Sequence, residues 1–255
     1  MNQLLRLYFV GLCVLCIGPV LAQLNQEKEE QESISVFSFD FSLAGQTPAG
    51  DLAERFGDNG SLGFGIQYKT VSQWIFGLEG AFLFGNNVKE PVAIGIRNSD
   101  GFIIDREGNF VNLLVLERGM TITASAGRLF PIFGPNKNSG IVVKLGGGFI
   151  EHRIRLEARL NEVPQIEGDY AKGYDRLTNG ATIFQFIGYR NFSDNRLLNF
   201  TLGIEGYQGF TQNRRAFDFD LGRKDDEKRL DVLVGVRLTW SLPLYSKDSK
   251  DYYYQ

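Results

Sequence analysis

The sequence predicts an all-β fold: an eight-stranded antiparallel up-and-down transmembrane β-barrel with long extracellular loops. Three observations predict it. The chain begins with a segment typical of an export signal. Eight later segments alternate apolar and polar residues with the period of two that is typical of β-strands. Long and short connections alternate between those segments, as the outer loops and periplasmic turns of a membrane barrel do.

Residues 1–22 have the features of a cleavable signal peptide: a basic start, an apolar run and a small residue, Ala22, at the end. Both cysteines, Cys13 and Cys16, lie inside this segment. The exported chain therefore cannot use disulfides or cysteine metal sites. We expect cleavage after Ala22, with residues 23–33 forming an acidic periplasmic lead-in.

The composition favours strands and excludes some classes of protein. Of 255 residues, 30 are Gly, 21 are Phe and 10 are Tyr, and aromatic residues favour strands. The 27 basic and 30 acidic side chains give a formal net charge of −3, which argues against a nucleic-acid partner. Beyond the signal, no run reaches the roughly 18 apolar residues of a transmembrane helix.

The first four strand segments cover residues 37–43, 61–69, 74–84 and 119–130. In the first of them Phe37, Phe39 and Phe41 alternate with polar residues, so one face is apolar and the other polar.

The last four strand segments cover residues 140–156, 181–189, 199–205 and 231–242. The fifth changes the parity of its apolar residues near Gly146-Gly147-Gly148, which predicts a glycine-rich β-bulge. The sixth has the least regular pattern, with Phe184 and Phe186 on either side of Gln185. The eighth segment has the clearest alternation.

The connections differ in length in a regular order. Long polar connections follow the odd-numbered strands, at residues 44–59, 85–117, 157–180 and 211–229. Short connections follow the even-numbered strands, at residues 71–73, 131–139 and 190–198. We therefore expect a barrel over residues 34–245, with both of its ends in the periplasm.

The polar face of the strands carries charges that a dry apolar core would not accept. They are Asp40, Lys69, Glu79, Lys144, Glu205 and Arg237. A polar lumen inside a lipid-facing barrel accommodates them, whereas a secreted β-sandwich, the alternative fold, would bury one face as its core. Aromatic residues near strand ends fit the interfacial girdles of such a barrel: Tyr68, Trp74, Phe84, Phe130, Tyr189, Trp240 and Tyr245.

With these features the chain resembles the eight-stranded outer-membrane β-barrels of Gram-negative bacteria, the group that includes the OmpA transmembrane domain and OmpX. The resemblance covers about residues 33–245 and rests on the export signal, strand period, loop alternation and aromatic last strand. It implies a place in the bacterial outer membrane, with its lipid as a partner. Such barrels usually end at the terminal aromatic residue, whereas here residues 246–255 follow as a Tyr-rich periplasmic tail.

Side chains fill a barrel of only eight strands, so we expect a closed lumen. Four of the charged residues on the polar face, Glu79, Lys144, Glu205 and Arg237, are expected to form an ion-pair network there. A narrow passive channel is the alternative.

The only histidine, His152, is the one candidate base for a lipid-modifying barrel enzyme. No serine is adjacent, and the neighbouring Glu151, Arg153 and Arg155 point to a charged rim instead. We therefore expect no enzymatic activity, no catalytic residue and no cofactor.

Calcium is the metal that aspartates in the loops could hold, and these are Asp100, Asp105, Asp218, Asp220, Asp225 and Asp226. Their spacing matches no EF-hand, so we expect solvated charge and no metal site.

The loops remain as the place for function. Turn signals in residues 97–110 predict a projecting β-hairpin. Aromatic and arginine residues are the types that anchor protein interfaces, and the candidates are Phe102, Tyr170, Tyr174, Arg214, Arg215 and Phe217. The sequence thus predicts a structural or accessory subunit of an envelope complex, bound to other envelope proteins through loops or tail.

Overall fold

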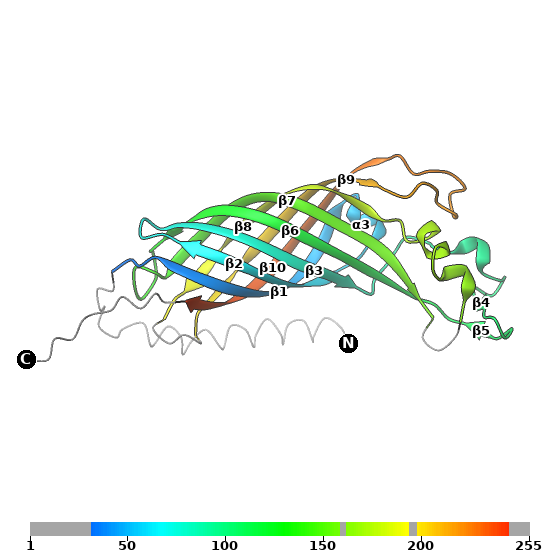
Figure 1. The fold of residues 1–255 in the computed structure, drawn as a ribbon, viewed down its shortest axis with the longest axis horizontal. Helices are drawn as coiled ribbons and strands as arrows, with labels where there is room; N and C mark the ends of the chain where they lie inside the picture. Colours follow the sequence, from blue (N-terminus) through cyan, green and yellow to red (C-terminus); the bar gives the residue numbers. More distant parts are fainter. Residues whose placement is uncertain (1–31, 159–161, 194–197, 245–255) are drawn as a thin grey trace, which may run out of the picture.

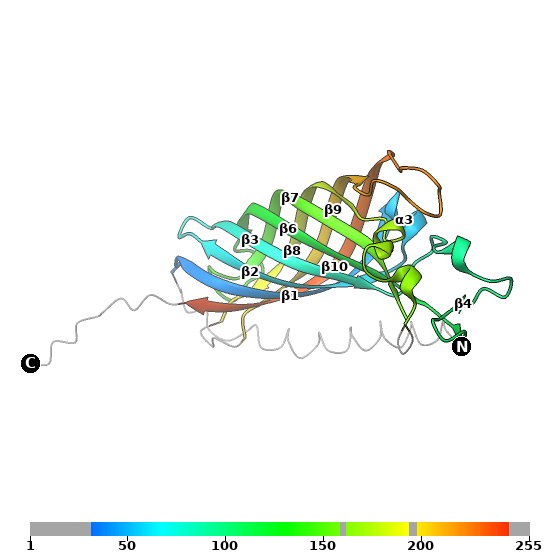
Figure 2. The same cartoon turned by 45° about the vertical axis from the view of Figure 1, so that its right-hand side comes forward.

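The computed structural model describes residues 32–158, 162–193 and 198–244. The predicted signal, nearly all of the lead-in and the Tyr-rich tail lie outside the described residues. Eight long strands close into a ring in the order β1-β10-β9-β8-β7-β6-β3-β2, and they cross the barrel obliquely (Figures 1 and 2). They are β1 (Val36–Gly50), β2 (Asn59–Lys69), β3 (Trp74–Gly85), β6 (Leu114–Phe130), β7 (Gly140–Glu157), β8 (Thr178–Asn191), β9 (Phe200–Asn213) and β10 (Lys228–Leu244).

Each long strand pairs antiparallel with its neighbours along the chain, and β10 returns to pair with β1. The closing ladder runs without a gap from Phe37 opposite Leu244 to Gly50 opposite Asp231. Closure of this kind leaves no strand edge unpaired. The predicted eight-stranded antiparallel up-and-down barrel is confirmed.

The two ends of the barrel differ. The turn end carries the described residues 70–73, 131–139, 192–193 and 198–199. The loop end carries the described residues 51–58, 86–113, 158, 162–177 and 214–227, and Figure 1 shows α3, β4 and β5 gathered there. Its short elements are α3 (Leu52–Arg55), η2 (Ile94–Ile96), β4 (Ile103–Ile104), β5 (Phe110–Val111), η3 (Pro164–Ile166) and η4 (Tyr170–Gly173). Within the described residues, no helix has the length and hydropathy needed to cross a membrane.

The first connection is shorter than the sequence predicts. Residues 44–50 do not form a loop but continue β1, with Ala44 opposite Arg237 and Pro48 opposite Leu233. The polar and turn-type residues of this stretch concealed its pairing. The hairpin predicted at residues 97–110 is present, because Ile103 and Ile104 of β4 pair with Val111 and Phe110 of β5.

Apolar side chains point outward over most of the barrel wall. Leu62, Phe64, Leu78 and Val236 are each more than half exposed, at 51–59 %. The inward face carries polar and charged side chains beside apolar ones such as Ile75 and Leu129. All six charged residues assigned to it from the sequence are inward, with Asp40, Lys69, Glu205 and Arg237 buried. This arrangement is the reverse of a water-soluble domain.

The glycine bulge predicted in β7 is absent. Its register with β6 continues without interruption through the glycines, from Ala126 opposite Leu145 to Ile122 opposite Phe149. The strand keeps its regular pairing, and what changes along it is which face of β7 carries the apolar residues. Beyond Phe149 the apolar Ile150 and Ile154 point inward and are buried, and charged residues point outward.

In β8 the phenylalanines point inward and Gln185 points outward. Phe184 and Phe186 are 3 % and 4 % exposed, and Phe184 packs on the ring of Tyr207, with centroids 5.1 Å apart. A Cβ atom at Gly203 would lie 2.6 Å from Cζ of Phe186, so the glycine makes room for this ring. Aromatic side chains therefore fill part of the lumen.

Candidate functional site: lumen and distal loops

Arg237 lies at the centre of the lumen between two acidic side chains. Its guanidinium forms an ion pair with Glu79 of β3, and its Nε atom lies 2.9 Å from Oε2 of Glu205 of β9. Neutral donors complete the group, since Gln46 donates to Glu205 at 2.7 Å and Ser42 to Glu79 at 3.0 Å. Three of the four lumen residues selected from the sequence therefore meet.

The fourth residue, Lys144, does not join this group directly. Its ammonium donates to Oε1 of Gln67 at 2.6 Å and lies 5.5 Å from the ring centroid of Phe186. Among the described residues it forms no ion pair within 4 Å. Lys144, Asp40 and Glu79 nevertheless line the same small polar cavity beside Arg237.

The turn end of the lumen has its own polar contacts. Lys69 points inward and donates to the backbone oxygen of Ile34 at 3.0 Å and to Oδ1 of Asn138 at 2.9 Å. Asn138 in turn donates to the backbone oxygen of Glu32 at 3.2 Å. These contacts fasten the segment before β1 across the turn at residues 131–139.

His152 is not at a charged rim, contrary to the expectation from its neighbours. It points inward at 1 % exposure, and its Nε2 lies 2.8 Å from Oδ2 of Asp231. The Thr211 hydroxyl donates to the same carboxylate oxygen, and the ring of Phe56 meets the imidazole edge-on at 5.5 Å. The hydroxyl is thus bonded to the carboxylate and not presented to the imidazole, unlike in a nucleophile–base pair.

The first loop turns back into the mouth of the barrel. Leu52 of α3 and Phe56 after it are buried, at 1 % and 0 % exposure. Arg55 lies 2.8 Å from Glu90 of the second loop and donates to the Thr178 hydroxyl of β8 at 3.1 Å. This short helix therefore covers the lumen. With the other described residues of the loop end, 86–113, 162–177 and 214–227, residues 51–58 form the roof of the barrel.

Arg176 joins three loops in the roof. It forms ion pairs with Glu90, with Asp218 at 3.1 Å and with Asp220 at 3.1 Å. Asp220 also accepts hydrogen bonds at 2.9 Å from the backbone N–H groups of Ala93 and Ile94. Burial opposes ionisation of Glu90, but the guanidiniums of Arg55 and Arg176 outweigh burial and hold the pKa of that carboxyl below its usual range.

The sequence suggested that the acidic loop residues are solvated. Several of them are instead buried and paired within the roof. Asp218 and Asp225 are buried, and Asp225 pairs with Arg229 at 2.7 Å. Asp105 accepts from the backbone of Asn109 at 2.7 Å and so closes the β4–β5 turn. Only the more exposed ones, such as Asp226, fit the expectation.

The six predicted interaction residues divide into two groups. Phe102, Tyr170 and Phe217 are exposed, at 42 %, 64 % and 47 %. The others make contacts within the roof. Tyr174 packs edge-on against Phe219 at 5.1 Å, Arg214 donates to Asn179 at 2.7 Å, and Arg215 pairs with Asp175.

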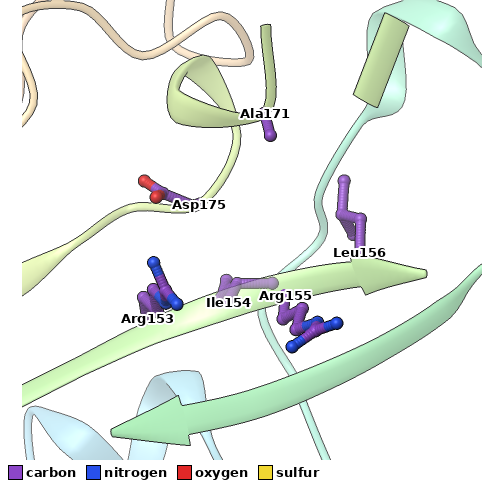
Figure 3. A pocket seen from close by; sticks show the side chains of 6 residues that line it. All are labelled: Arg153, Ile154, Arg155, Leu156, Ala171 and Asp175. Atoms are coloured by element: carbon purple, nitrogen blue, oxygen red, sulfur yellow. The ribbon is translucent and has the colours of Figure 1, made fainter. Parts of the chain in front are cut away.

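A pocket of about 200 Å³ lies between the loop end of β7 and the third loop. Its lining residues are Arg153, Ile154, Arg155, Leu156, Ala171 and Asp175. Figure 3 shows the loop segment with Ala171 and Asp175 across the pocket from the strand. None of these residues was selected from the sequence as a binding residue.

No protein-family model and no curated protein matches the chain. Among solved structures it is similar to Ail, the attachment invasion locus protein of Yersinia pestis, with 8% identity, 82% of this chain and 99% of that chain covered, and a TM-score of 0.42. It is also similar to Neisserial surface protein A, with 12% identity, 80% of this chain and 96% of that chain covered, and a TM-score of 0.42. The N-terminal β-barrel domain of Pseudomonas aeruginosa OprF is 9% identical, with 80% of this chain and 96% of that chain covered and a TM-score of 0.35.

The fold assignment rests on the strand pairing of this chain itself. Eight antiparallel strands, neighbours in sequence, close through the β1–β10 ladder. The chain has the eight-stranded up-and-down β-barrel architecture of the group that its sequence pattern resembles.

Proposed function

We propose that this chain is an outer-membrane β-barrel with a closed lumen, which acts as a structural or accessory subunit of an envelope complex through its loops. The observation that carries the proposal is the pairing of an apolar outer wall with a buried, charged interior. A water-soluble protein rarely exposes an apolar patch larger than a few hundred Å². In a bilayer the same wall faces hydrocarbon, and the closed ring satisfies the backbone.

Aromatic residues on the outer wall support the membrane position. Tyr68, Trp74, Phe130 and Trp240 point outward near the turn end and are 39–46 % exposed. The amphipathic rings of Tyr and Trp favour the level of lipid headgroups. With an export signal before the barrel, the turn end faces the periplasm and the loop end faces the cell exterior.

A closed lumen favours a structural role over the alternative, a narrow passive channel. The Arg237 group fills the centre, and Leu52 and Phe56 cover the loop end. An ion would have to displace a buried guanidinium from two carboxylates, which costs about 3–5 kcal/mol when such a pair is broken. The contacts of His152 with Asp231 support a structural role for this residue, and we propose no enzymatic activity.

The roof supports a role in binding other envelope proteins. Its ion pairs hold three loops together, and Phe102, Tyr170 and Phe217 remain exposed on it. A surface that is already ordered loses less conformational freedom on association.

The test is mild-detergent extraction of a loop-tagged chain from its native membrane, with particle size and co-purifying proteins measured together. We expect a particle larger than the barrel with defined companions, which the Phe102→Ser/Tyr170→Ser variant loses and Lys224→Ser, a change at another exposed loop residue, keeps. A particle of barrel size without companions would contradict the accessory role. Current steps in a planar bilayer would favour the channel.

A further inference from the structure

The outer wall of β6 and β7 changes from apolar to basic at one level of the barrel. On β7 the outward series Val143, Leu145, Phe149 is followed by Glu151, Arg153 and Arg155. On β6 the outward Ile122 and Met120 are followed by Arg118. The arginines thus lie on the loop side of the apolar wall, together with Glu151 on β7 and Leu116 on β6.

Two of these arginines stand directly opposite each other. Arg118 and Arg153 are cross-strand partners, and both point outward. Arg153 makes no hydrogen bond or ion pair with any residue in the described part of the chain. Arg118 donates to backbone oxygens, those of Glu117 at 2.6 Å and Gly85 at 3.4 Å. Like charges directly opposite on neighbouring strands destabilise a sheet, so an anion between them would be stabilising.

The nearby carboxylates are already engaged elsewhere. Glu151 accepts from Asn179 at 3.1 Å, and Asp175 is paired with Arg215. Glu157 pairs with Arg155 at 2.7 Å, but both side chains are partly exposed, at 33 % and 56 %. An ion pair that open to solvent is weak, so Arg155 can exchange Glu157 for another anion at little cost.

A pocket between β7 and the third loop provides the space beside these arginines. Arg153 and Arg155 occupy consecutive outward positions on β7 and line the pocket, whose other wall contains Ala171 and Asp175, the carboxylate already paired with Arg215 (Figure 3). Its volume of about 200 Å³ is several times the ~30 Å³ share of one water molecule in the liquid. A phosphate group can therefore enter it.

We propose that Arg118, Arg153 and Arg155 bind a phosphate-bearing headgroup of an outer-leaflet lipid. This inference rests on the proposed membrane position. If the apolar wall lies in hydrocarbon, the first charged side chains beyond it lie at the level of lipid phosphates. Guanidinium groups donate two parallel hydrogen bonds to phosphate oxygens. All three arginines point outward from barrel strands, which favours a lipid over a soluble anion.

The test uses bilayers with equal amounts of phosphatidic acid, the phosphate probe, and zwitterionic phosphatidylcholine. The chain is extracted, and the lipids that it retains are counted by native mass spectrometry. One cation near a membrane surface contributes enough for an approximately fivefold preference. We expect the wild type to retain phosphatidic acid at least about fivefold over phosphatidylcholine, and Arg153→Gln/Arg155→Gln to retain the two nearly equally.

Lys228→Gln is the matched control, because Lys228 is an exposed outward cation at the loop end of β10, on the opposite side of the ring from β6. It should keep the full preference. Arg118→Gln, a milder change, should lower the preference in part, and heat-modified migration reports folding of each variant.

Retention of the preference by a folded Arg153→Gln/Arg155→Gln variant would overturn the inference, and so would an equal loss in Lys228→Gln. Displacement of the retained lipid by inorganic phosphate alone would assign the site to free phosphate and overturn the lipid assignment. A wild-type chain that does not insert would overturn the proposed function as well, whereas insertion without lipid preference would overturn this inference alone.

Discussion

The Nε atom of Arg237 lies 2.9 Å from Oε2 of Glu205 in the middle of the barrel, where their side chains are 4 % and 0 % exposed. The same guanidinium pairs with Glu79, so one cation compensates two carboxylates from two strands. A charge group of this kind is stable only as a unit, because removing one member leaves the others buried without a counter-charge.

Replacing Arg237 should therefore destabilise the barrel. We expect Arg237→Leu to lower the free energy of unfolding by about 3–5 kcal/mol, measured by urea titration in detergent micelles. Arg128→Leu, an outward arginine that lies 5.8 Å from the ring centroid of Trp74, should cost less than about 1 kcal/mol. Equal stability of Arg237→Leu and wild type would contradict a structural lumen network.

Arg176→Ala should loosen the roof and leave the strands intact. Asp218 and Asp220 would lose a counter-ion at 3.1 Å each, so we expect local opening to become easier by about 3 kcal/mol. Hydrogen exchange should rise at Ala93 and Ile94, whose N–H groups bond to Asp220. Lys224→Ala, which breaks only an exposed pair with Asp226, is the control. Unchanged protection in Arg176→Ala would disprove this role.

The roof should weaken in acid. The pKa of Glu90 is lowered from 4.5 in the folded chain, so its contribution is complete above about pH 4.5 and is lost as the pH falls through the lower folded value. We expect hydrogen exchange of the roof, corrected for its intrinsic pH dependence, to be constant from pH 7 to 5 and to rise below pH 4.5. Glu90→Gln should reduce this rise in hydrogen exchange below pH 4.5. Loosening between pH 5 and 7 would contradict the assignment.

His152→Ala should affect stability and no chemical activity. The substitution removes the partner of Asp231 at 2.8 Å, and a buried group left unsatisfied costs about 1–3 kcal/mol. His152→Asn, which can still donate to the carboxylate, should recover part of the loss in a thermal unfolding experiment. Lipid composition of membranes that contain the variant should be unchanged; a specific lipid product lost with His152→Ala would support an enzyme instead.

The strands could be predicted because each has one face on the outer wall and the other toward the lumen. Apolar and polar residues therefore alternate along the sequence with a period of two. The same reasoning failed where the environments change along one strand. In β7 the apolar residues exchange faces after Phe149, which in sequence is indistinguishable from a bulge. In β8 the lumen is filled by Phe184 and Phe186, so apolar character did not identify the outward face.

The candidate site was only partly predictable. Alternation placed Glu79, Glu205 and Arg237 on one face, although it could not show that they meet while Lys144 bonds to Gln67. The contacts of Arg176 join residues 42 or more positions apart in irregular loops. Their pairing depends on tertiary packing, for which local sequence carries no signal.

The most direct test of the membrane-spanning barrel is site-specific spin labelling. Residues 23–255 contain no cysteine, so single cysteines can be placed at Leu78 and Val234 on the outer wall, at Thr123 in the lumen and at Arg153 beyond the apolar wall. In vesicles, labels at Leu78 and Val234 should be accessible to oxygen dissolved in lipid and protected from a water-soluble nickel chelate, whereas Arg153 should be accessible to the chelate and Thr123 to neither. Access of the nickel chelate to Leu78 and Val234 would contradict the account.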